Sequence, residues 1–125
     1  MGFETTKFLL ANGATVVMCC RDAGRGKAAH KQIIEKVQND LLASGNASTE
    51  TTAMLEDRLL LRFIDLASIR SVRMFVERFN FEYENTLKRL DLLILNAAQT
   101  GVLFCMNLVI SSIFNYYLYN YSFIQ

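Results

Sequence analysis

The chain has 125 residues, enough for one domain, and 52% of them are hydrophobic, which is ample for a buried core. Its 13 basic and 12 acidic residues give a formal net charge of +1, so charge provides no argument for a nucleic-acid partner or an anionic membrane surface. The three cysteines, Cys19, Cys20 and Cys105, are odd in number and lack metal-ligand spacing. We therefore expect reduced thiols, no metal site and a cytoplasmic location.

The first 43 residues predict a helix, a strand and a second helix. Residues 2–12 are compatible with a helix, and Gly13 is placed to end it in a left-handed backbone conformation. Residues 14–20 form a short, Val-rich apolar run, typical of a strand buried on both faces of a parallel sheet. Residues 23–43 then predict an amphipathic helix, in which we interpret His30 as a solvated surface imidazole without a role. Apolar residues recur in it at helical spacing, at Ala29, Ile33, Val37 and Leu41.

The middle of the chain continues the alternation of helices and strands. Residues 44–53 are rich in Gly, Asn, Ser and Thr and predict a surface loop, and residues 58–65 predict a second strand. Ser68 is placed to cap a third helix, and residues 90–95 predict a third buried strand. This order favours parallel strands joined by right-handed crossovers. The apolar stripe of the third helix steps by three and four residues, through Ile69, Val72, Val76, Phe79 and Tyr83.

The end of the chain differs abruptly in composition. No charged residue occurs in residues 92–125, and tyrosines cluster near the C-terminus. We therefore divide the chain into a domain of residues 1–98 and a divergent apolar tail of residues 99–125. Residues 102–124 are just long enough to cross a membrane, since about 20 apolar residues suffice. Three asparagines within this stretch and the lack of flanking Lys or Arg argue against a spanning helix.

Several short stretches of residues 1–98 match one family in their order and spacing. They are residues 2–7 (GFETTK), 13–18 (GATVVM), 20–22 (CRD), 25–26 (RG), 65–73 (DLASIRSVR) and 90–94 (LDLLI). In these stretches the chain resembles the short-chain dehydrogenase/reductase family, in the branch of the retinol dehydrogenases and WW-domain-containing oxidoreductases. The resemblance implies an α/β fold, a partial Rossmann-like parallel sheet with flanking helices that lacks the family's first strand and C-terminal half. It also implies hydride transfer between a nicotinamide dinucleotide and an alcohol or carbonyl substrate.

The resemblance places a cofactor site at the carboxyl ends of the strands. Gly2 would correspond to the last glycine of the family's phosphate-binding turn, whereas by itself it reads as a helix-boundary residue. Arg21 ends the first strand, where a guanidinium can clamp a 2′-phosphate, which favours NADP(H) over NAD(H). Outside the family context Arg21 is a solvated arginine. Asp22 could accept a hydrogen bond from a ribose hydroxyl or cap the following helix.

Two further strand ends carry residues that the resemblance assigns to the cofactor. In similar proteins the carboxylate at Asp65 accepts from the adenine amine while the backbone amide of Leu66 contacts the ring. The alternative for Asp65 is a turn-forming or helix-capping aspartate. Asn96 and the small residue Ala97 would let the backbone approach the cofactor ribose at the end of the third strand.

The family's catalytic residues have no counterpart in this sequence. Family members use a Tyr-x-x-x-Lys couple and a serine, but no tyrosine here is followed by lysine at that spacing. We nominate no catalytic residue and expect little or no turnover. The family's first strand lies between the first and third strands seen here, so we hypothesise that residues 102–110 either fill that gap or remain poorly packed. An alternative function is a non-catalytic interaction or membrane-associated form that uses residues 102–124.

Overall fold

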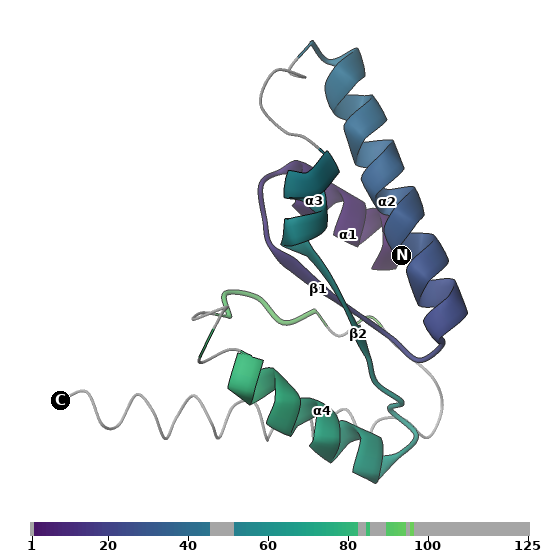
Figure 1. Cartoon of the computed structure of the whole chain (residues 1–125), viewed down its shortest axis with the longest axis vertical. Helices are drawn as coiled ribbons and strands as arrows, with labels where there is room; N and C mark the ends of the chain where they lie inside the picture. Colours follow the sequence, from purple (N-terminus) through teal and green to yellow (C-terminus); the bar gives the residue numbers. More distant parts are fainter. Residues whose placement is uncertain (1, 46–51, 83–84, 86–89, 95, 97–125) are drawn as a thin grey trace, which may run out of the picture. The chain divides into compact units, whose positions relative to one another are not determined.

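A computed structural model of the chain describes residues 2–45, 52–82, 85, 90–94 and 96. The chain divides into two compact units, Met1–Phe63 and Ile64–Gln125, and each is described by itself. The described elements, in chain order, are α1 (Gly2–Ala11), β1 (Val16–Cys20), α2 (Ala23–Ala43), α3 (Thr52–Arg58), β2 (Leu59–Phe63) and α4 (Ile69–Glu82). Figure 1 labels α1, β1, α2, α3 and β2, which belong to the first unit, and α4, which belongs to the second.

Strands β1 and β2 form a parallel pair, as the alternating pattern predicts. Their register runs from Val16 opposite Leu59 to Cys20 opposite Phe63, and the connection between them passes through α2 and α3. The predicted α/β fold is therefore confirmed. Both strands are shorter than the apolar runs in the sequence, which begin or end outside the ladder. The prediction that the first strand is buried on both faces was wrong: no residue of β1 is fully buried and Cys19 is exposed, because the described core packs against Val16 and Met18 on one face.

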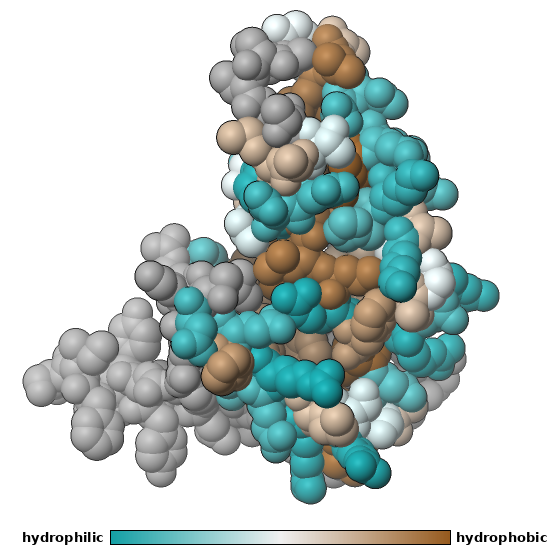
Figure 2. Space-filling model, in the orientation of Figure 1, coloured by the Kyte–Doolittle hydropathy of each residue, from teal (hydrophilic) through white to brown (hydrophobic). Residues whose placement is uncertain are grey.

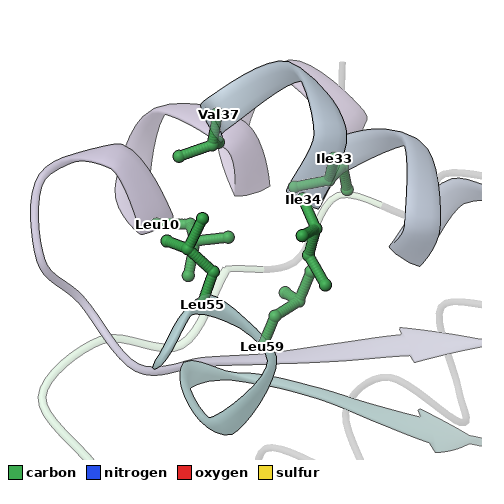
Figure 3. Packing of buried hydrophobic residues seen from close by; sticks show 6 residues of the cluster. All are labelled: Leu10, Ile33, Ile34, Val37, Leu55 and Leu59. Atoms are coloured by element: carbon green, nitrogen blue, oxygen red, sulfur yellow. The ribbon is translucent and has the colours of Figure 1, made fainter. Parts of the chain in front are cut away.

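The core of the first unit lies between the helices and one face of this sheet. Alternate strand residues, Val16 and Met18, pack against it, so the two-residue period of the strand turns them towards the helices. Figure 2 shows hydrophilic side chains over the outer face of α2, as an amphipathic helix requires. The buried cluster draws on α1, α2, α3 and β2 (Figure 3) and consists of Leu10, Ile33, Ile34, Val37, Leu55 and Leu59.

Glycine ends α1 in the predicted way. Gly13 has a φ of +87°, which lies in the left-handed region that residues with a Cβ rarely adopt. Its amide donates to the Leu10 carbonyl and the Ala14 amide donates to the Leu9 carbonyl, both at 3.1 Å. These bonds satisfy carbonyls at the end of the helix and turn the chain directly into β1.

Helix α3 was not predicted, since it begins inside the predicted loop of residues 44–53. It has seven residues, too few for the apolar period of a helix to be visible in the sequence. Two contacts hold it in place: the Leu55 side chain is fully buried, and the Thr52 hydroxyl donates to Gln38 Oε1 at 2.8 Å. Tertiary packing therefore decides the conformation of this segment.

In the second unit, α4 begins and packs largely as predicted. Ser68 Oγ accepts a hydrogen bond from the Ser71 amide at 3.3 Å, which confirms the predicted N-cap. Val72, Val76 and Phe79 are buried. Ile69 is 43% exposed, so its assignment to the apolar stripe was wrong; it is the first residue of the helix. Tyr83, the last residue of that stripe, lies outside the described residues.

The predicted third strand is not formed by residues 90–94. These residues adopt no regular secondary structure, and the Leu92 side chain is 63% exposed. Of this segment, Leu90 packs against the small cluster of Ile64 and Val72. The prediction was wrong because an apolar run becomes a strand only beside a partner, and the sheet of the described residues contains β1 and β2 alone.

Other predictions fall on residues that the structure does not describe. They concern Leu95, the boundary after residue 98, the gap-filling strand of residues 102–110 and the apolar stretch of residues 102–124, and they stay predictions. Within the described ranges, no helix combines the length and apolar character needed to cross a membrane.

Candidate cofactor site

Arg21 is the first residue after β1, at the carboxyl end of the parallel pair. Both strands point the same way, so Cys20 and Phe63, which are paired, mark one edge of the sheet. Open parallel sheets bind ligands beyond this edge. The Arg21 side chain is exposed. Among the described residues, no hydrogen bond or ion pair engages its guanidinium.

Asp22 caps α2, which realises one of its two predicted roles. Its backbone is extended, with a φ of −95° and a ψ of 123°, and its Oδ1 accepts from the Arg25 amide at 2.7 Å. The Asp22 carbonyl accepts from the Gly26 amide at 2.9 Å. One carboxylate oxygen is thus engaged by the helix, and the alternative contact with a ribose hydroxyl stays a prediction.

Gly26 allows the first turn of α2 to lie close to the sheet. A Cβ added there would come within 3.2 Å of Cys20 Cβ and 3.3 Å of Leu61 Cδ1. These separations are tighter than ordinary van der Waals contact, so a larger residue would require the Cys20 and Leu61 side chains or the helix to shift. Sequence reasoning did not give Gly26 this role. The available signal was a glycine in the first turn of a helix, four residues after a capping aspartate.

Asp65 and Leu66 form the turn between β2 and α4. Asp65 Oδ1 accepts from the Ala67 amide at 3.0 Å, and the Asp65 amide donates to Ser71 Oγ at 2.9 Å. The turn-forming alternative for this aspartate is therefore confirmed. Leu66 is partly buried against Ile64 and Val72. Contact of either residue with an adenine ring remains a prediction.

The remaining predicted site residues occupy the ends of the described segments. Gly2 is the first residue of α1, and its carbonyl accepts from the Thr6 hydroxyl at 2.8 Å. Asn96 is exposed and lies outside any helix or strand, and Ala97 is not among the described residues. Gly2, Arg21 and Asp22 belong to the first unit, whereas Asp65, Leu66 and Asn96 belong to the second.

The two thiols of β1 are not activated nucleophiles. Cys19 and Cys20 are both free, as predicted, whereas Cys105 lies outside the described residues. Desolvation raises the pKa of Cys19 to about 11, with Cys20 adding to the rise and Arg62 opposing it, and burial raises the pKa of Cys20. Both side chains are therefore protonated at neutral pH. In the described part of the chain, no group of His, Cys, Asp and Glu could hold a metal ion.

His30 corrects a prediction. It is half-buried, and its Nε2–H donates to the Leu59 carbonyl at 2.7 Å, so it is not a solvated surface imidazole. The error arose because His30 lies beside Ala29 at the border of the apolar stripe, where a long side chain can reach the backbone of a neighbouring strand. His30 thus links α2 to the beginning of β2.

Comparisons with known proteins agree with this architecture. No family model matches the chain. It is 37% identical to retinol dehydrogenase 14 from Mus musculus over 105 residues, which are 84% of this chain and 27% of that protein. It is 33% identical to the WW domain-containing oxidoreductase from Gallus gallus over 106 residues, 85% of this chain and 20% of that protein.

A solved structure supports the same relationship. The menthone neomenthol reductase from Mentha piperita superposes with a TM-score of 0.58 and 26% identity, over 80% of this chain and 28% of that one. Over most of its length the chain is therefore homologous to members of the short-chain dehydrogenase/reductase family. Its curated homologues are retinol dehydrogenases and WW domain-containing oxidoreductases, and the chain spans between 20% and 27% of the two relatives above.

Proposed function

We propose that this chain carries part of the nicotinamide-dinucleotide site of a short-chain oxidoreductase, and that it receives the adenosine end of NADP(H). The other predicted contacts belong to the same proposal: Gly2 at the pyrophosphate, Asp65 and Leu66 at the adenine, and Asn96 and Ala97 at the ribose. When bound, the cofactor would supply the hydride.

One observation carries the preference for NADP(H) over NAD(H). Arg21 directly follows β1, its side chain is exposed, and no described residue binds its guanidinium. A guanidinium presents paired donors that match the geometry of a phosphate, and a phosphate on the ribose is what distinguishes NADP(H) from NAD(H). An exposed arginine that no described residue binds, at the carboxyl edge of a parallel sheet, is thus suited to that recognition.

We further infer that this chain binds cofactor without turnover. Hydride transfer to a carbonyl requires a proton donor, which family members provide with a tyrosine whose pKa is lowered by a neighbouring lysine. The sequence contains five tyrosines, and none is followed by lysine four positions later. The residues present can bind and orient a cofactor, but they offer no acid–base pair for the substrate.

The test is a titration of the full chain with NADPH and NADH, followed by fluorescence. We expect NADPH to bind more tightly, and Arg21→Ala to weaken NADPH binding by about tenfold or more while changing NADH binding less, because hydrogen bonds between charged groups contribute about 1.5–3 kcal/mol. Arg78→Ala is the matched control, since it removes an exposed guanidinium from α4, beyond its first turn.

Two results would contradict the proposal. Absence of saturable binding by either cofactor would remove the binding function, and an equal loss of affinity for both cofactors in Arg21→Ala would remove the phosphate contact. NADPH oxidation in the presence of an aldehyde would contradict the absence of turnover.

A further inference from the structure

The first turn of α2 is fixed against the end of β1 by contacts that converge on Asp22 and Gly26. Asp22 holds the helix with its side chain, through the Arg25 amide at 2.7 Å, and with its backbone, through the Gly26 amide at 2.9 Å. Gly26 is buried, and a Cβ there would approach Cys20 and Leu61 within 3.2 and 3.3 Å. The position of this turn relative to the sheet is therefore closely determined.

Arg21 lies between two fixed points. On one side Cys20 is held in the parallel ladder opposite Phe63, and on the other side Asp22 is held by its capping bonds. A single residue between two such anchors has little freedom in its backbone. The cap at Asp22 and the strand at Cys20 thus both set the direction of the exposed Arg21 side chain.

The cap also decides what the Asp22 carboxylate can do. A carboxylate at the end of this strand can accept hydrogen bonds from the ribose hydroxyls of NAD(H), and its negative charge opposes a phosphate at the same place. Because Oδ1 binds the Arg25 amide, the carboxylate is directed towards the helix, where the positive end of the helix dipole stabilises its charge. Capping therefore leaves Arg21 as the group that is available to the ribose.

We propose that Asp22 is a positioning residue for cofactor selectivity: its capping of α2 directs the Arg21 guanidinium, and not its own carboxylate, to the 2′-substituent of the adenosine ribose. This inference rests on the proposed function and deepens it. It assigns the selectivity to the pair of neighbouring residues, with Arg21 in contact with the phosphate and Asp22 acting through Arg21.

The experiment compares Asp22→Ser with Asp22→Ala in the full chain. Both variants remove the carboxylate and its charge, but only serine retains an oxygen that can cap the helix, so their difference reports the cap alone. The probes are adenosine 2′,5′-bisphosphate and adenosine 5′-monophosphate, and the readout is the ratio of their affinities by calorimetry. Amide hydrogen exchange at Arg25 reports the capping bond independently.

We expect Asp22→Ser to prefer adenosine 2′,5′-bisphosphate over adenosine 5′-monophosphate at least as strongly as the wild type does. Asp22→Ala should show a ratio about fivefold smaller than that of Asp22→Ser, the equivalent of the ~1 kcal/mol that a cap contributes, because binding must then restore the ordered turn. Exchange at Arg25 should accelerate in Asp22→Ala only. Asp22→Gln serves as a second non-capping variant if Asp22→Ala does not fold.

Three other results would overturn either this inference or the proposed function. An equal loss of affinity for both probes in Asp22→Ala would show a merely structural cap and overturn the inference, as would identical ratios in the serine and alanine variants. Failure of the wild type to bind either probe would instead overturn the proposed function itself, and the two failures are therefore distinguishable.

Discussion

The two units differ in how far their apolar sequences are converted into packed structure. In the first unit two helices, a short third helix and a parallel strand pair enclose a cluster with several fully buried side chains. In the described part of the second unit, α4 buries one face, and the apolar run that follows it is exposed from Leu92 to Ile94. Both units contain strand-like sequences, so composition alone does not explain the difference.

The comparison shows that an apolar segment forms a strand only when a second strand is present to pair with it. Val16 to Cys20 has its partner in β2, and the five register pairs satisfy one edge of each strand. Residues 90–94 are also mostly apolar, with Asp91 as the one charged residue, but they pair with neither strand of the described sheet. An apolar run is therefore sufficient to predict a paired strand in one unit and insufficient in the other.

The largest effect is expected from a cavity in the core of the first unit. Leu55→Ala removes a fully buried side chain from α3 and should lower the free energy of unfolding by about 3 kcal/mol, through lost burial and the cavity left behind. Urea denaturation followed by circular dichroism measures this change. The matched control is Met54→Ala on the same helix, which removes a half-exposed side chain and should cost about 0.5 kcal/mol or less.

Equal costs for these two variants would contradict the packing of α3. They would mean that this helix does not contribute to the core, and that the first unit is held by α1, α2 and the strand pair alone.

A smaller effect is expected in the second unit. Leu92→Ser should change the free energy of unfolding by about 0.5 kcal/mol or less, because the Leu92 side chain is already 63% exposed. Had residues 90–95 formed the buried strand that the sequence predicts, the same change would cost about 2 kcal/mol or more. A loss of that size in urea denaturation would show that this segment packs as a strand and would remove the contrast between the units.

Local signals in the sequence predicted much of the fold. Helix α2 has the predicted bounds because its apolar spacing persists over 21 residues and a capping aspartate precedes it. Gly13 and Ser68 were predicted in their roles for a similar reason, since a left-handed turn and an N-cap each depend on the chemistry of one residue and its near neighbours.

Features that depend on distant neighbours could not be predicted in this way. The bond from His30 to Leu59 joins residues 29 positions apart, and α3 depends on the burial of one leucine against other elements. The close approach of Gly26 to Cys20 and Leu61 likewise exists only once the helix lies on the sheet. For the candidate site, the sequence predicted the cap at Asp22, and the cofactor role of Arg21 stays a prediction; the close approach of α2 to the sheet required the structure.

The central claim is that the residues at the carboxyl end of β1 receive a phosphorylated adenosine. The most direct measurement is the amide spectrum of the ¹⁵N-labelled full chain during titration with adenosine 2′,5′-bisphosphate. The account predicts saturable shifts at the amides of Arg21 to Gly26, with smaller changes at the exposed outer face of α2. Saturable binding that leaves those amides unmoved and shifts residues elsewhere would contradict it.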